Sequence, residues 1–363
     1  MTRRTLLAAS SLPALAAESN SSRPKVFFTG DGLSLTTLEQ ARLLADLAAQ
    51  GQCETDSYSL GGAVEKLEKK FAAMLGKEAA VFLPTGTLAN HLGLRILAGD
   101  KRRVLVQGDS HIYCDSGDCG QTLSQLNLIP LRTGQAAFGL DDVKREVSRG
   151  RTGRVITEVG VISIETPVRR HFGEVMPIAD MRAICSYARS EGIGTHLDGS
   201  RIYMAAPFTG VSAKEYASMF DTVYISLWKY FNSTSGAVLA GPKKLLENLF
   251  HTRRMFGGGI PHAWPMTAIA LHYADGFEER IARAAEASRE LFKELGVEKT
   301  AQGSHIGWLK AKDPASLRKK LSAQGIEIGD ATADRGNRIP LNVNESLLRR
   351  PVAEIARAFQ QSI

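Results

Sequence analysis

Hydrophobic and polar residues recur along this chain with two periods, one typical of helices and one typical of strands. Residues 63–76 are the clearest helical pattern, because Leu67 and Phe71 belong to a row of apolar residues spaced three or four positions apart among lysines and glutamates. A short apolar run at 79–83 predicts a strand, and a second helical pattern covers 88–97. This part of the chain therefore predicts helix, strand and helix in succession.

The alternation of short apolar runs with helical patterns continues as far as residue 241. Further strands are predicted at 103–107, 127–131, 155–164, 194–197, 222–227 and 236–240. Helical patterns lie between some of them, at 140–149, 178–190 and 213–219. Strands that alternate with helices favour an α/β fold in which a mostly parallel sheet is covered by helices on both faces.

The pattern changes after Gly241. A long helical stretch at 265–295 is followed by short predicted strands near 306–311, 326–328 and 338–341. A chain of 363 residues is also longer than one simple core requires. We therefore expect a large domain at 25–245 and a smaller C-terminal α/β domain at 246–363.

The first residues combine two arginines with a short apolar run that ends in small residues. Arg3 and Arg4 precede the run at 6–17, and Ala14-Leu15-Ala16 has the spacing of a signal-peptidase site. The run is too short to span a bilayer permanently. It predicts a twin-arginine-type signal peptide at 1–17, hence a periplasmic or secreted protein with no membrane association after cleavage. The alternative is a frayed basic helix on a cytoplasmic protein.

Composition excludes several classes of partner. The hydrophobic content of 44% and charged content of 23% are ordinary for a globular enzyme. The formal charge of +7 is spread along the chain without a basic, aromatic-rich module, so no nucleic-acid partner is expected, although the charge suits an anionic cofactor. The four cysteines form no C-x-x-C pair and have no histidines at zinc-ligand spacing, so no metal site is expected.

Two ionisable residues follow predicted strands of the large domain. Lys229 comes after the strand at 222–227, and Asp198 comes after the strand at 194–197. Ligands of open α/β sheets bind beyond the carboxyl ends of the strands. A partly desolvated lysine there is nucleophilic, and a carboxylate can keep the pyridine nitrogen of pyridoxal 5'-phosphate (PLP) protonated. Alone, each would be a solvated lysine or a turn aspartate, but together they indicate a PLP site.

Two further motifs fit the same cofactor. Gly86 and Thr87 lie where a strand turns into a helix, and the backbone N–H groups of such a turn favour phosphate. His111 follows the strand at 103–107 and could stack on the pyridine ring. On its own, Thr87 could equally be an ordinary helix N-cap, and a solitary loop histidine is usually structural.

Together these motifs resemble the threonine aldolase and aromatic amino acid β-eliminating lyase group of PLP enzymes. The resemblance covers about residues 25 to 360. It rests on the order and spacing of these motifs: residues 77–90, His111, Glu165-Thr166, residues 196–201, residues 226–229 and the glycines at 257–259. It implies the PLP-dependent transferase-like fold of the aspartate aminotransferase superfold, known as fold type I.

The resemblance also implies roles for the residues that hold the cofactor. Gly86 and Thr87 would bind the phosphate, and Asn90 would support their turn. His111 would stack on the ring, and Asp198 would pair with the pyridine nitrogen.

For the reaction itself, the resemblance implies that Lys229 carries PLP as a Schiff base. Arg201 would lie near the cofactor or bind the substrate carboxylate, and Arg338 would clamp that carboxylate bidentately. The expected reaction is retro-aldol cleavage of a β-hydroxy amino acid to glycine and an aldehyde, with His111 as candidate base. A homodimer or homotetramer is also implied.

Three departures from the family pattern concern substrate and cofactor handling. Ser116 stands where the family usually has Glu, Pro261 stands where it has Arg, and Trp228 and Tyr230 flank the lysine in place of Ser and Gly. These departures leave two alternative functions open. One is another PLP reaction on the same scaffold, β-elimination or transamination. The other is a non-catalytic exported binding protein built on the PLP fold.

Overall fold

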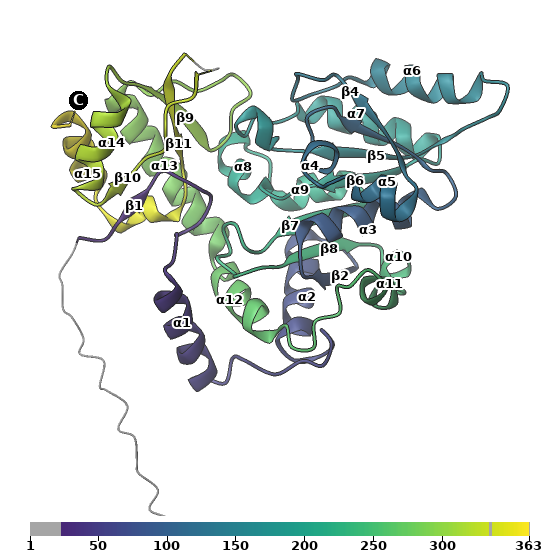
Figure 1. Ribbon diagram of the computed structural model, residues 1–363, viewed down its shortest axis with the longest axis horizontal. Helices are drawn as coiled ribbons and strands as arrows, with labels where there is room; N and C mark the ends of the chain where they lie inside the picture. Colours follow the sequence, from purple (N-terminus) through teal and green to yellow (C-terminus); the bar gives the residue numbers. More distant parts are fainter. Residues whose placement is uncertain (1–22, 334–335, 363) are drawn as a thin grey trace, which may run out of the picture.

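The computed structural model describes residues 23–333 and 336–362 (Figure 1). The predicted signal peptide at 1–17 lies outside the described residues. No helix in the described ranges is long and apolar enough to cross a membrane.

A seven-stranded sheet forms the centre of the molecule, with strand order β2-β8-β7-β6-β5-β3-β4. Its strands are β2 (Ala79–Leu83), β3 (Arg103–Gln107), β4 (Asn127–Leu131), β5 (Val159–Glu165), β6 (Gly194–Asp198), β7 (Thr222–Ser226) and β8 (Ala237–Gly241). Strand β8 runs opposite to the other six strands of this sheet, which are parallel to one another. The predicted mostly parallel sheet is therefore confirmed.

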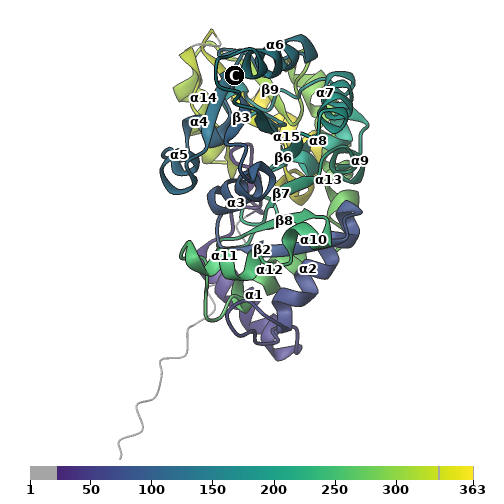
Figure 2. The same cartoon turned by 90° about the vertical axis from the view of Figure 1, so that its right-hand side faces the viewer.

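Helices cover both faces of this sheet (Figures 1 and 2). In this part of the chain they are α2 (Gly62–Leu75), α3 (Gly86–Ala98), α4 (His111–Cys114), α5 (Cys119–Ser124), α6 (Leu140–Arg151), the 3₁₀ turn η1 (Arg169–His171), α7 (Ile178–Ser190), α8 (Ile202–Thr209), α9 (Ala213–Met219), α10 (Lys243–Leu246) and α11 (Leu249–Met255). Successive strand residues point to opposite faces, so Leu105 and Ile162 join the core under α2 and α7, while Val104 and Val161 join the core under α3. This two-sided burial explains why the central strands are apolar throughout.

Two predicted elements differ from the structure. The expected strand at 155–164 begins only at Val159, because Val155 and Ile156 are exposed at 77% and 66% and join no sheet. The long helical stretch at 265–295 is two helices, α12 (Trp264–Ala274) and α13 (Phe277–Leu295). Gly276, between them, has a left-handed backbone with φ of 62°, which a continuous α-helix cannot accommodate.

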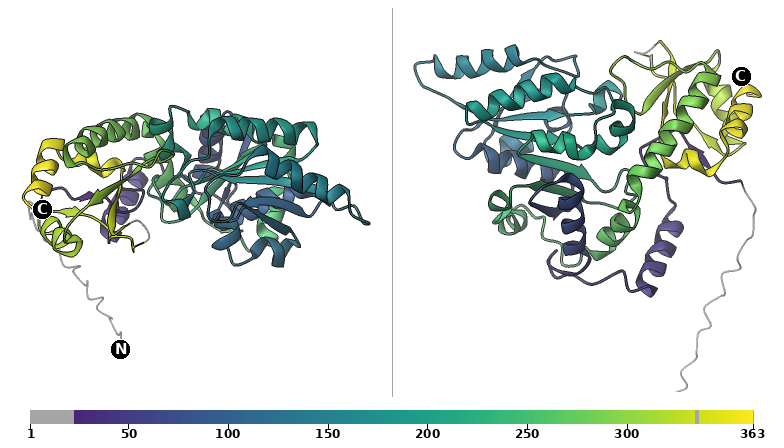
Figure 3. Two further views of the ribbon diagram at one scale, coloured as in Figure 1. Left: turned by 90° about the horizontal axis from the view of Figure 1, so that it is seen from above. Right: turned by 180° about the vertical axis from the view of Figure 1, so that it is seen from behind.

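The C-terminal elements gather on one side of the large sheet (Figure 3). They are β9 (Ile306–Lys310), α14 (Pro314–Ser322), β10 (Ile326–Glu327), β11 (Arg338–Asn342), η3 (Glu345–Arg349) and α15 (Val352–Gln360). The N-terminal strand β1 (Val26–Phe27) pairs with β10, and α1 (Thr37–Ala49) packs on α12. The chain before α2 is thus tied to the C-terminal half, whereas the predicted domain boundary at 245/246 stays a prediction.

Candidate active site

Three ionisable residues meet beyond the carboxyl ends of neighbouring parallel strands. Glu165 ends β5 and lies directly opposite Asp198, the last residue of β6. Lys229 follows β7, whose Tyr224 is the register partner of Asp198. Sheet register therefore brings the predicted lysine and aspartate to one place, together with a second buried carboxyl group.

The amine of Lys229 lies in a largely desolvated, ring-lined position. Its Nζ is 5.2 Å from the ring centroid of Trp228 and 6.0 Å from that of Tyr224. Burial, together with the nearby Arg201, lowers the Lys229 pKa to about 8, while Asp198 opposes the shift. Far more of this amine is therefore neutral, and so nucleophilic, near neutral pH than for an ordinary lysine.

The start of α3 offers donors for an anion. Thr85 is the N-cap: its hydroxyl accepts the Leu88 N–H at 3.2 Å, and its carbonyl accepts the Ala89 N–H at 3.1 Å. The N-cap is thus Thr85 and not Thr87. Helix geometry leaves the N–H groups of Gly86 and Thr87, the first two helical residues, to bind an outside acceptor.

Gly86 and Ser226 shape the region around the start of α3. A Cβ on Gly86 would collide with the Tyr224 hydroxyl, so only glycine allows α3 to approach β7 this closely. Ser226 lies on the same face of β7 as Tyr224, two residues further along. Its Oγ is fully buried and makes no hydrogen bond of good geometry among the described residues, although it lies close enough to the Tyr224 phenol to oppose the rise of that group's pKa. A buried hydroxyl in this position, beside a helix start, can donate to the phosphate of PLP.

Asp198 is almost completely buried and held from two sides. Its Oδ2 accepts the Asn90 amide at 2.6 Å, and its Oδ1 accepts the Ser200 N–H at 3.1 Å. Asn90 therefore supports the carboxylate, whereas the family resemblance implied a role in the glycine turn. An ionised carboxylate in this position fits a protonated pyridine nitrogen.

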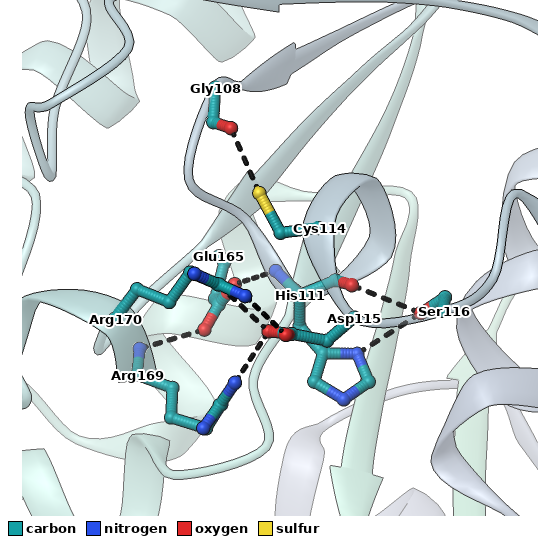
Figure 4. A network of polar contacts seen from close by, with 8 residues as sticks. All are labelled: Gly108, His111, Cys114, Asp115, Ser116, Glu165, Arg169 and Arg170. Atoms are coloured by element: carbon teal, nitrogen blue, oxygen red, sulfur yellow. Dashed lines mark hydrogen bonds and ion pairs between the residues drawn. The ribbon is translucent and has the colours of Figure 1, made fainter.

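His111 begins α4 and is fixed through both its backbone and its ring (Figure 4). Its N–H donates to Glu165 Oε2 at 2.6 Å, and its Nδ1 lies 3.2 Å from Ser116 Oγ. The Ser116 hydroxyl donates to the His111 carbonyl at 3.0 Å, so it satisfies both contacts when Nδ1 carries the ring proton. Nε2 is then the basic nitrogen. Burial lowers the His111 pKa, which keeps the ring neutral.

Glu165 was part of the sequence motif, but no role was predicted for it. Its Oε1 accepts the Arg169 N–H at 2.9 Å, while its Oε2 accepts the His111 N–H (Figure 4). Burial, and then repulsion by Asp198, raises the Glu165 pKa to about 7. Glu165 thus anchors both the His111 turn and η1 beside the site.

Arg201 is held by residues that the sequence did not single out. Its Nε and Nη2 donate to Asp31 Oδ2 at 2.9 and 2.8 Å, and His305 Nε2 lies 3.4 Å from Asp31 Oδ1. The Asp31 and His305 side chains are buried and that of Arg201 is 14% exposed. Against the opposing effect of burial, the two basic partners hold the Asp31 pKa well below its usual range. No local signal marks Asp31, because it lies 170 positions from its partner.

Arg338 is the one predicted site residue that lies apart. It begins β11 in the C-terminal sheet, where its Nη1 pairs with Glu298 Oε2 at 2.8 Å and the side chain is 39% exposed. Within the described residues, no recorded contact joins Arg338 to Lys229 or Asp198. Its predicted role as carboxylate clamp stays a prediction.

Comparisons with known proteins identify the family of this chain. The family model described as beta-eliminating lyase matches residues 36–302. The chain is 34% identical over 213 residues to a low-specificity L-threonine aldolase of Candida albicans, covering 58% of this chain and 56% of the relative. It is 30% identical over 208 residues to the low specificity L-threonine aldolase of Saccharomyces cerevisiae, covering 57% and 53%. It thus spans little more than half the length of these curated relatives.

Solved structures match over almost the whole chain. A putative L-allo-threonine aldolase from Listeria monocytogenes superposes with a TM-score of 0.76 at 25% identity, covering 94% of this chain and 97% of that one. A serine palmitoyltransferase of Sphingomonas wittichii, at 18% identity, shares the fold with a TM-score of 0.65, covering 93% and 86%. The predicted fold is confirmed, and the family model covers well over half of the sequence. The chain belongs to the beta-eliminating lyase family.

Proposed function

We propose that this protein is a PLP-dependent carbon–carbon lyase that cleaves a β-hydroxy amino acid into glycine and an aldehyde. The observation that carries the proposal is Lys229, an amine of lowered pKa beyond β7 that shares one site with the buried carboxylate of Asp198. The threonine aldolases among its relatives support this choice of reaction.

The described residues fit each part of the cofactor. The N–H groups of Gly86 and Thr87, with the Ser226 hydroxyl, would hold the phosphate. Asp198 would pair with the pyridine nitrogen, and Lys229 would attach the cofactor covalently. When bound, PLP supplies an electron sink for the bond that breaks next to the substrate amine.

Two side chains act directly on the substrate in this proposal. Arg201 binds the α-carboxylate with the guanidinium edge that Asp31 leaves free, since Asp31 occupies only Nε and Nη2. His111 accepts the β-hydroxyl proton at Nε2 as the Cα–Cβ bond breaks, while Ser116 holds Nδ1. The products would be an aldehyde and glycine, whose Cα gains one proton to balance the proton that His111 takes from the β-hydroxyl.

Another reaction on the same scaffold is the second candidate. The chain is 27% identical over 286 residues to an alanine racemase of Cochliobolus carbonum, so relatives of similar sequence differ in reaction. Ser116 replaces the usual Glu beside His111, the candidate base. Product analysis separates the candidates: an aldolase releases glycine and an aldehyde, elimination or transamination releases a keto acid, and a racemase releases the other enantiomer of the amino acid.

The proposal also includes a second subunit. Several large apolar side chains are exposed in the single chain, Trp228 beside Lys229 among them: Tyr58 at 41%, Leu60 at 54%, Trp228 at 54% and Met255 at 66%. A homodimer or homotetramer that covers them would remove this apolar surface from water.

The test is the absorbance spectrum of the protein with PLP, before and after Lys229→Ala. The expected result is a visible band of lysine-bound cofactor that the substitution abolishes, followed by aldehyde and glycine production from β-hydroxy amino acids. Lys299→Ala is the matched control, since burial also lowers the pKa of Lys299 to about 8 but Lys299 lies against Phe208, with Nζ 3.9 Å from that ring centroid. A band that survives Lys229→Ala would overturn the proposal.

A further inference from the structure

We propose that Thr222, His196 and Asn90 form a directed hydrogen-bond chain that positions the Asp198 carboxylate for the cofactor's ring nitrogen. The inference rests on the proposed PLP function. It assigns positioning roles to Thr222 and His196, and gives Asn90 a partner other than the phosphate turn.

The chain of contacts is continuous. Thr222 Oγ1 lies 2.8 Å from His196 Nδ1, and His196 Nε2 lies 2.9 Å from Asn90 Oδ1. Asn90 Nδ2 lies 2.6 Å from Asp198 Oδ2. The side chains of all four residues are buried, with exposures of 0%, 0%, 1% and 4% in that order, so water does not compete for these bonds.

The chemistry of its last member determines the direction of the chain. An ionised carboxylate only accepts hydrogen bonds, so Asn90 must present its NH₂ group to Asp198 and its carbonyl to His196. His196 must then donate from Nε2, which leaves Nδ1 to accept the Thr222 hydroxyl proton. Every donor in the chain points toward Asp198, and bonds aligned in this way strengthen one another.

The fold is shaped to hold the His196 ring in this place. Thr222 is the register partner of His196 on the adjacent strand, and α3 packs across both strands. Gly93, three residues after Asn90 on α3, faces the ring: a Cβ there would come within 2.8 Å of His196 Cε1. A larger residue at this position would push the helix away from the ring and break the contact with Asn90.

The hydrogen-bond chain itself places no cation next to Asp198. Burial lowers the pKa of His196 to about 4, although Asp198 opposes the shift, so the ring is neutral near pH 7. Asp198 therefore meets only neutral donors in this chain, and its charge remains available to a protonated pyridine nitrogen. Since α3 also begins at the predicted phosphate site, one helix sets the position of both ends of the cofactor.

The test compares PLP binding by Asn90→Ala, His196→Ala, Thr222→Val and Thr222→Ser. We expect about ten- to hundredfold weaker PLP binding for Asn90→Ala, the range for loss of a hydrogen bond to a charged group. His196→Ala should also weaken binding, Thr222→Val should have a smaller effect, and Thr222→Ser should restore it. The pH midpoint of the visible band should also shift in the variants that bind PLP more weakly, and it should shift most in the variant that binds PLP least.

His91→Ala is the matched control. His91 is the next residue on α3, is equally buried and has its pKa lowered to about 4, but its Nε2 contacts Ser124 Oγ at 2.6 Å, away from Asp198. The His91→Ala variant should have a lower free energy of unfolding and an unchanged affinity for PLP. Melting temperatures of the cofactor-free variants separate a folding defect from a binding defect.

A measurement without cofactor keeps this inference distinct from the proposed function. In ¹⁵N-labelled cofactor-free protein, NMR should find the His196 proton on Nε2. A proton on Nδ1 overturns the chain, as do wild-type PLP affinity and band titration in Asn90→Ala and His196→Ala. Equal losses of affinity in these variants and His91→Ala would also overturn it. If wild-type protein binds no PLP through Lys229, the proposed function fails instead.

Discussion

At the scale of single residues, the site depends on how burial changes ionisation. Lys229 and Glu165 both have pKa values moved toward neutrality, to about 8 and about 7, and burial is the largest cause for each. Desolvation disfavours the charged form, so it lowers the pKa of an amine and raises that of a carboxyl group. The two shifts therefore have one physical origin, and the shift of Lys229 makes its amine more nucleophilic near neutral pH.

The first prediction concerns the pH dependence of cofactor attachment. The neutral amine of Lys229 is the reacting form, so the rate at which cofactor-free protein gains the visible band should rise with pH and level off near 8. An ordinary lysine, with a pKa of 10.5, would keep rising well beyond that pH. Reconstitution rates between about pH 6 and 10 check this point. Lys299→Ala should leave the profile unchanged, and a rate that still rises steeply as the pH approaches 10 would contradict the lowered Lys229 pKa.

The second prediction concerns Asp31. Asp31→Ala leaves the buried guanidinium of Arg201 without its partner, which should lower the free energy of unfolding by about 3–5 kcal/mol. The Asp31 pKa is depressed, so its contribution is fully present above the unfolded carboxyl pKa and is lost only as pH falls toward the folded value. Urea unfolding at neutral and strongly acidic pH measures the loss. Equal destabilisation at both pH values would contradict this account.

At the scale of elements, α3 is the helix that assembles the site. Its N-terminus offers the N–H groups of Gly86 and Thr87, its next turn supplies Asn90, and Gly93 lets it lie against His196. The helical pattern at 88–97 was predicted correctly, because it depends on local spacing. The break at Gly276 was missed, since the apolar period continues across it and only the backbone conformation ends the helix.

The third prediction tests the close approach of α3 to β7. Gly86→Ala should weaken PLP binding by about tenfold or more, because the new methyl group meets the Tyr224 hydroxyl and moves the helix start. Tyr224→Phe in the same protein should restore part of the affinity. Gly120→Ala is the control, since a Cβ there meets only Leu126 and Leu128 side chains, at ordinary distances of 3.6 Å or more. Equal PLP affinities in the two glycine variants would contradict the prediction.

At the scale of the whole molecule, long-range contacts join the C-terminal half to the site. Asp31 follows β1, which pairs with β10, and it binds Arg201 at the start of α8. His305, which precedes β9, contacts Asp31 in turn. Arg201, the proposed carboxylate-binding residue, is therefore held directly by one distant segment and indirectly by a second. Its orientation should be sensitive to any movement between the two sheets.

The fourth prediction concerns assembly. Leu60→Glu should convert the proposed dimer or tetramer into smaller species, because it places a charge in an apolar surface that a second subunit would cover. Multi-angle light scattering measures the mass. Val155→Glu is the control, since Val155 is 77% exposed just before β5, outside any sheet. A wild-type monomer would contradict the proposed assembly.

Local patterns in the sequence determined the α/β alternation, the family and the positions of Lys229 and Asp198 at strand ends. These features depend on residues that are close together in the sequence, so the spacing of hydrophobic residues and the residue types typical of turns reveal them. The family resemblance is confirmed by the matching family model.

Only the tertiary structure decided which side chains meet. The contacts of Asp198 with Asn90, 108 positions away, and of Arg201 with Asp31, 170 positions away, depend on strand order and on the face each side chain takes. The pKa shifts were likewise decided by the tertiary structure, because side chains become buried only when distant elements pack together. A single sequence carries no local signal for such pairs, so Glu165, His196 and His305 gained their roles from the fold.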